Sequence, residues 1–286
     1  MSNPRPTKAE RTAEAREKAR ALREEQQRKE KRNKLLVRWG VVVAVVAVIA
    51  LIFAVVFSNM NRSIPAAGPV PANGNLDGGV TLTSTTSLAP TDGGEVDTEN
   101  LPEGTGEGQP PRGVEPGAEG EPVPIVVYAD VNCVHCATFE DAYGDQIAQW
   151  LDAGEITYEY RLVSFLDRNS PTNYSSRGAN AAACVADTAP ESYWDFTAAI
   201  FAQHAQGEVD NQGLADMAAS VGAEGAESCI KDDGFRTYVK YTTELAQADG
   251  VQGTPTVYVN GTEANLDAFT ETVQAAIDGN GGADSE

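Results

Sequence analysis

The segment Cys133-Val134-His135-Cys136-Ala137-Thr138-Phe139-Glu140 follows closely on the apolar run Ile125-Val126-Val127-Tyr128, and this pairing decides the fold. Two cysteines separated by two residues lie one helical turn apart, so they can open and close a disulfide. If a helix begins at Cys133, its free backbone N–H groups and positive dipole end favour a thiolate there. His135 can supply a second positive charge. The spacing therefore predicts Cys133 as the nucleophile, with a lowered pKa, and Cys136 as the resolving cysteine.

A second motif, Gly253-Thr254-Pro255-Thr256-Val257-Tyr258-Val259-Asn260-Gly261, reads as a turn, a short strand and another turn. Together the two motifs resemble the DsbA-like thiol-disulfide oxidoreductases of the thioredoxin superfamily, in which a strand, a CxHCxxFE helix, a helical insertion and a cis-proline loop follow in this order. The resemblance covers about Pro122 to Gly279. It implies an α/β, thioredoxin-like fold, a cis Pro255, and Thr254 beside the active-site sulfurs.

The chain departs from the family pattern at several positions. Val134 stands where many strongly oxidising members have proline, and Val127 stands where the superfamily often buries an acid. Thr254 before the proline looks more like disulfide isomerases and reductases than like the enteric oxidase. The sequence therefore predicts the chemistry but leaves the direction of electron flow open, and Val127 supplies no carboxylate for a proton relay.

The dithiol has two other interpretations. A zinc knuckle needs further ligands, whereas Cys184, Cys229 and His204 each stand alone in the sequence. An inert structural disulfide between Cys133 and Cys136 is the other alternative. The strand-to-helix context favours a redox pair. Glu140 is interpreted either as a solvated helix residue or as a charge near the site.

Cys184 and Cys229 both fall within a predicted helical insertion, residues 173–248, where Ala-rich stretches are interrupted by glycine and proline. Lone cysteines in an extracytoplasmic protein more often pair than stay free, so a structural disulfide is predicted. A second, shuttling redox site is the alternative, and it is disfavoured because neither cysteine has a CxxC neighbour.

The N-terminal part predicts a membrane anchor. Residues 1–38 carry thirteen Lys or Arg and six Glu, a net charge of +7, and are predicted to form a cytoplasmic segment. Residues 39–57 are predicted to form one transmembrane helix, because eighteen uncharged, mostly apolar residues from Gly40 to Phe57 extend about 27 Å. The basic residues before it place the N-terminus inside. A cleaved signal peptide is the rival, and the long basic region argues against it.

Three further segments complete the expected organisation. Residues 58–121 are rich in Gly, Pro, Ser, Thr, Asp and Glu and are predicted to be a disordered extracytoplasmic linker. Residues 122–279 are predicted to form the catalytic domain, and residues 280–286 a flexible tail. Within the domain, strands are expected at 123–128 and 156–165, the active-site helix at 133–153, and a closing helix at 265–277.

Charge restricts the partners. The chain has a net charge of −21, which leaves −28 after Arg38, so nucleic-acid binding by the external part is excluded. The sequence favours an extracytoplasmic protein disulfide oxidase that acts on unfolded or reduced exported proteins, without a bound cofactor or metal. The resemblance implies a membrane quinone-linked thiol oxidase as the partner that reoxidises it. A reductase or isomerase of the cell envelope is the alternative, followed by a tethered binding module with a structural disulfide.

Overall fold

The computed structural model describes residues 23, 26, 28, 29, 39–50, 64–106 and 108–280. The chain divides into two compact units, Met1–Arg62 and Ser63–Glu286. In the first unit, every described residue is helical. The expected membrane helix at 39–57 falls within the described residues only as far as position 50, and most of the 1–38 segment and of the 280–286 tail lie outside them. Among the residues that are described, none belongs to a helix both long and apolar enough to cross a membrane.

The second unit is built on a six-stranded sheet with the strand order β3-β2-β6-β5-β7-β8. Its strands are β2 (Val80–Ser84), β3 (Ser87–Leu88), β5 (Val123–Ala129), β6 (Ile156–Leu162), β7 (Thr256–Val259) and β8 (Thr262–Glu263). β5 runs parallel to β6 and antiparallel to β7. All but one of the seven β5 residues are buried, as expected of an apolar strand covered on both faces.

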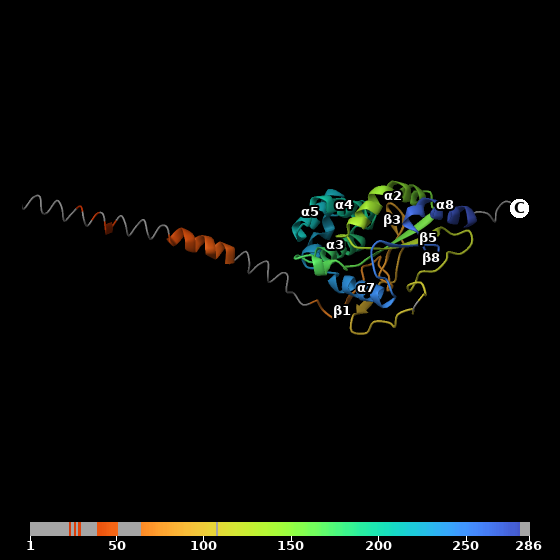
Figure 1. The fold of residues 1–286 in the computed structure, drawn as a ribbon, viewed down its shortest axis with the longest axis horizontal. Coiled ribbons are helices and arrows are strands. Elements are labelled where there is room, and N and C mark those ends of the chain that lie inside the picture. Colours follow the sequence, from red (N-terminus) through yellow and green to blue (C-terminus); the bar gives the residue numbers. More distant parts are fainter. Residues whose placement is uncertain are drawn as a thin grey trace, which may run out of the picture. The chain divides into compact units, whose positions relative to one another are not determined.

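Helices cover both faces of this sheet (Figure 1). α2 (Val134–Asp152) and α8 (Phe269–Asn280) share one face, where the rings of Phe139 and Phe269 lie 5.0 Å apart. On the other face, Val126 and Tyr128 of β5 pack in a separate apolar cluster with Ala246 of α7 (Arg236–Ala248). The predicted thioredoxin-like α/β architecture is therefore confirmed in its central sheet and flanking helices.

The helical insertion between β6 and β7 comprises α3 to α7, within the predicted 173–248 region. Besides α7 it contains α3 (Tyr174–Thr188), α4 (Tyr193–Gln203), α5 (Asn211–Ser220) and α6 (Glu227–Lys231). The 3₁₀ turns Pro190–Ser192, His204–Gln206 and Glu224–Ala226 lie between these helices. Two further 3₁₀ turns, Asp167–Asn169 and Leu266–Ala268, come before α3 and α8, respectively. A Cβ at Gly178 would lie 2.6 Å from Val131, so α3 approaches the active-site loop closely. Small residues in α3 thus bring the insertion against the site.

The expectation of a disordered linker at 58–121 is wrong for its described residues, 64–106 and 108–121. β1 (Ala67–Pro69) pairs with β4 (Glu95–Asp97), and β2 joins the main sheet by pairing antiparallel with β6. The few large aliphatic residues of this segment are mostly buried, among them Val70, Val80, Leu82, Val96 and Val114. Its composition could not build a core of its own, but it is ordered by the core of the catalytic domain.

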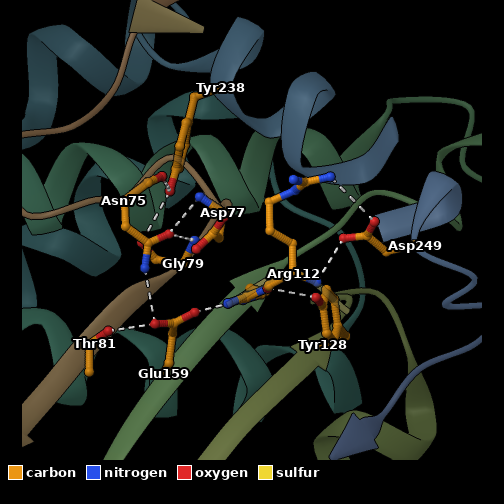
Figure 2. A network of polar contacts seen from close by, with 10 residues as sticks. Asn75, Asp77, Gly79, Thr81, Arg112, Tyr128, Glu159, Tyr238 and Asp249 are labelled. Atoms are coloured by element: carbon orange, nitrogen blue, oxygen red, sulfur yellow. Dashed lines mark hydrogen bonds and ion pairs between the residues drawn. The ribbon is translucent and has the colours of Figure 1, made fainter. Parts of the chain in front are cut away.

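Polar contacts attach the same segment to β6 (Figure 2). Oε2 of Glu159 accepts hydrogen bonds from Asn75 Nδ2 at 3.0 Å and from Thr81 Oγ1 at 2.7 Å. The other oxygen of Glu159 pairs with Nε of Arg161, a side chain that is 1% exposed. Arg161 Nη1 also donates to the carbonyl of Arg112 at 2.6 Å. A buried ion pair on β6 is therefore completed by residues far earlier in the chain.

Candidate active site

Cys133 caps the N-terminus of α2, one residue before the first helical position. Its N–H donates to the carbonyl of Asp130 at 2.9 Å. Cys133 is 7% exposed and Cys136 is 1% exposed, and both are free thiols. The next two residues face solvent, since Val134 is 53% exposed and His135 is also exposed. Both sulfurs are therefore enclosed, with Cys133 at the tip of the helix and Cys136 more deeply buried one turn below.

The proline loop lies against the first sulfur. The Thr254–Pro255 peptide bond is cis, and the Cys133 thiol donates to the carbonyl of Thr254 at 3.3 Å. Pairing of Tyr128 with Thr256 in the β5–β7 ladder holds the loop there. Strand pairing therefore joins two motifs that are far apart in the sequence.

The environment of Cys133 stabilises its thiolate. The pKa of Cys133 is lowered to about 5, first by a hydrogen bond from the Cys136 thiol, which outweighs partial burial. The side chain of Thr254 and the backbone N–H groups of Cys136 and His135 contribute further hydrogen bonds. A thiol with a pKa near 5 is about 99% ionised at pH 7, against about 1% at a pKa of 9.

Cys136 has the opposite environment. Burial raises the pKa of Cys136 far above its ordinary value, and its hydrogen bond to Cys133 and the charge there raise it further. The pair therefore holds one thiolate and one thiol at neutral pH. This asymmetry assigns nucleophile and leaving group to Cys133, and resolving thiol to Cys136.

Asp130 organises the loop before the cysteines and was not singled out from the sequence. The side chain is fully buried; Oδ1 accepts from the Asn132 N–H and Oδ2 from the Leu166 N–H, each at 2.9 Å. Burial raises the pKa of Asp130 to about 6, against hydrogen bonds that lower it. In the sequence, only the position of Asp130 directly after a buried strand indicates its role.

Glu140 supplies a buried carboxyl group even though Val127 does not. Part of the residue is exposed, but the carboxyl end is enclosed and Oε2 accepts a 2.8 Å hydrogen bond from Tyr160. Burial raises the pKa of Glu140 to about 7, outweighing the hydrogen bond from Tyr160 that lowers it. Burial raises the pKa of Tyr158, and the charge of Glu140 raises it further. Glu140 follows Cys136 by four residues in α2, so the two lie about one helical turn apart. Of the two interpretations of Glu140, the structure favours a charge near the site.

The remaining cysteines lie elsewhere in the fold. Cys184 of α3 and Cys229 of α6 form a disulfide with an S–S distance of 2.02 Å and a sequence separation of 45 residues. His204 lies in the 3₁₀ turn after α4. Across the described ranges, no three His, Cys, Asp or Glu side chains are grouped so as to hold a metal ion.

Known proteins share this domain. The thioredoxin family model matches residues 111–279. Disulfide bond formation protein D of Bacillus subtilis (strain 168) is 26% identical over 178 residues, which cover 57% of this chain and 76% of that protein. The serine/threonine-protein kinase PknE of Mycobacterium tuberculosis (H37Ra) is 30% identical over 159 residues, 51% of this chain but only 28% of the kinase.

A solved structure agrees with the fold. The MdbA protein of Actinomyces oris, a thiol-disulfide oxidoreductase, superposes with a TM-score of 0.54 at 22% identity, covering 72% of this chain and 92% of that chain. The family match includes both the dithiol at the start of α2 and the cis-proline loop before β7. The chain therefore belongs to the thioredoxin family, and its site is that of a protein disulfide oxidoreductase.

Proposed function

We propose that this protein is an extracytoplasmic, DsbA-like disulfide oxidase, held at the cell membrane by a single helix at 39–57. The observation that carries the proposal is the opposite shift of the two cysteine pKa values, down to about 5 for Cys133 and upward for Cys136. A stabilised Cys133 thiolate stabilises the reduced enzyme, so the Cys133–Cys136 disulfide becomes oxidising.

The reaction transfers two electrons from the substrate to the enzyme. A substrate thiolate attacks Cys133 Sγ, the Cys133–Cys136 bond breaks, and a mixed disulfide forms while Cys136 takes up a proton. The second substrate thiol loses its proton and attacks the substrate sulfur of the mixed disulfide, which releases Cys133 as a thiolate. The substrate leaves with a disulfide and the enzyme is left reduced. In this scheme Thr254 and cis Pro255 lie beside the mixed disulfide, and His135 lies on the exposed side of the dithiol.

Location and partners follow from the same proposal. The basic residues before position 39 support a cytoplasmic N-terminus and an external catalytic unit. The Cys184–Cys229 disulfide suits an oxidising compartment. The substrates are then reduced, unfolded exported proteins, and a membrane quinone-linked thiol oxidase returns the dithiol to its disulfide. Because the fold begins by Ile64, residues 58–63 alone separate it from the proposed anchor, in place of a long tether.

Redox titration of the full-length protein in detergent tests the oxidase. The Cys133–Cys136 couple is equilibrated in glutathione buffers, and thiolate absorbance gives the Cys133 pKa. Thioredoxin has a reduction potential of about −270 mV, and a value well above it is expected here, together with an acidic Cys133 pKa. A potential at or below that value contradicts the oxidase and indicates a reductase. Failure of iodoacetamide to label Cys133 in the reduced native protein would instead indicate a structural disulfide.

A further inference from the structure

Glu208 lies in the loop between α4 and α5, where the helical insertion reaches the active-site loop. We propose that Glu208 is a specificity-determining residue that favours substrates carrying a Lys or Arg beside the reacting cysteine. The inference rests on the proposed thiol-disulfide exchange at Cys133 and names the substrate class that this site prefers.

The contacts of Glu208 join its carboxylate to the residue that directly precedes the catalytic cysteine. Oε1 accepts a hydrogen bond from Asn132 Nδ2 at 3.2 Å, and Asn132 directly precedes Cys133. Oε2 accepts from Thr172 Oγ1 at 2.6 Å. The carboxylate is therefore fixed by two donors, so a substrate cation that pairs with it needs to order little of the protein.

The carboxylate keeps its charge at neutral pH. Partial burial alone would raise the pKa of Glu208, but hydrogen bonds from Thr172, Ser170 and Asn132 and the charge of Arg177 outweigh it and lower this pKa. The guanidinium of Arg177 donates to Thr172 and Asn211. Among the described residues, no ion pair includes Glu208. Within the part of the chain that the structure describes, Glu208 thus presents a negative charge with no cation at ion-pairing distance, and Arg177 acts on it only from farther away.

This charge remains accessible to a substrate. Glu208 is exposed, and a carboxylate has about four lone-pair positions, of which the hydrogen bonds from Asn132, Thr172 and Ser170 use three. A mixed disulfide on Cys133 brings the residues next to the substrate cysteine over Asn132 and Val134. A basic side chain on the Asn132 side therefore reaches Glu208, whereas an acidic one is repelled.

The rest of the domain adds to the same preference. After Arg62 the chain carries 36 Asp or Glu residues but only seven Lys or Arg. Such a charge excess attracts basic chains from a distance in a salt-dependent way. The charge excess attracts basic chains as a whole, whereas Glu208 selects the residue at one position of the substrate, beside the reacting cysteine.

Three dithiol peptides that differ only in having Lys, Gln or Glu beside the reacting cysteine provide the test. Second-order rates of exchange with the full-length protein are measured in both directions, by oxidising the dithiol peptides and by reducing their disulfide forms. Comparing the Lys/Glu rate ratio between variants cancels the effect of the peptide charge on its own cysteine. We expect Glu208→Gln to lower this ratio about three- to tenfold and to change the rate with the Gln peptide less than twofold.

Glu224→Gln is the matched control, since Glu224 is an exposed acid of the same insertion and makes none of the hydrogen bonds described to the active-site loop. This variant removes the same charge and should leave the ratio unchanged. An equal fall in both variants would assign the preference to the overall charge excess and overturn the inference. Equal slowing of all three peptides by Glu208→Gln would do the same, because it indicates loop positioning without charge selection. If no peptide exchanges in either direction, the proposed function fails and the inference with it, whereas exchange with an unaltered ratio contradicts the inference alone.

Discussion

The hydroxyl of Tyr160 donates a 2.8 Å hydrogen bond to Oε2 of Glu140, which lies four residues after Cys136 in α2. The hydroxyl comes from β6 and the carboxyl from the active-site helix, so the contact connects the two inside the core. Because the pKa of Glu140 is raised to about 7, a proton can be held or released there near physiological pH. The fold thus places a titrating acid near the resolving cysteine without using the position of Val127.

Replacing Glu140 with glutamine should remove a pH dependence of stability. The pKa of Glu140 in the folded protein, about 7, lies above its ordinary value of 4.5, so the folded state binds more protons than the unfolded state. Stability from this group is complete below about pH 4.5 and is lost as the pH rises to about 7. At pH 8, Glu140→Gln should therefore be more stable than the wild type, by up to about 3 kcal/mol. Urea denaturation at pH 4.5 and pH 8 measures the difference.

Tyr160→Phe is the companion variant, because it removes the donor and leaves the carboxyl group. The pKa of Glu140 should then rise further, which enlarges the loss of stability between these pH values. Equal slopes of stability against pH in the wild type and Glu140→Gln would contradict a buried, titrating Glu140.

Cys136→Ala should raise the pKa of Cys133. The thiol of Cys136 is the first cause of the lowered value, and a hydrogen bond to a charged group is worth about 1.5–3 kcal/mol, or about 1–2 pKa units. Cys136→Ser keeps a donor and should raise the pKa less. The pH profile of iodoacetamide labelling reports the change, with a wild-type midpoint near pH 5. A Cys136→Ala midpoint equal to that of the wild type would show that Cys136 does not stabilise the thiolate.

A chain that begins at Glu121 should fail to fold stably. This truncation removes β2 from the edge of β6 and leaves Glu159 without the donors Asn75 and Thr81. Unpaired buried polar groups cost about 1–3 kcal/mol each, and lost burial adds to that. A chain that begins at Ser63 keeps these contacts and is the control, and circular dichroism compares the two. Leu82→Ala is a milder test, since Leu82 is fully buried and its truncation should cost about 2–5 kcal/mol.

Removing the disulfide of the insertion should lower the melting temperature. Cys184→Ser with Cys229→Ser opens a loop closed over 45 residues, which is worth about 4 kcal/mol in the chain-entropy model. The exchange rates at Cys133 should change little at temperatures where the variant stays folded. A reducing agent should produce the same downward shift in the wild type, on top of the change that it causes in the double variant by reducing the Cys133–Cys136 pair. An unchanged melting temperature would remove the structural role of this bond.

Local patterns account for what the sequence predicted well. The apolar run before the dithiol predicted β5 within one residue, and the cysteine spacing predicted that α2 begins at the site. The family resemblance supplied the cis bond before Pro255, which no dipeptide pattern implies.

Long-range contacts explain what the sequence did not predict. Residues 64–121 lack the apolar content to fold alone, and their order comes from β6 and α7, which follow much later in the chain. Glu208 is an ordinary surface acid by its sequence, and only the packing of the insertion brings it to Asn132. The sequence does not decide between the two interpretations of Glu140, because helical spacing does not show that Glu140 faces the hydroxyl of Tyr160.

Both outer strands of the six-stranded sheet, β3 and β8, contain only two residues each. A longer exposed edge would offer a row of free N–H and C=O groups to any extended chain. In the proposed function the protein's substrates are unfolded polypeptides, which are rich in such partners. The short edges therefore let the enzyme handle aggregation-prone chains while giving them little opportunity to add a strand to its own sheet.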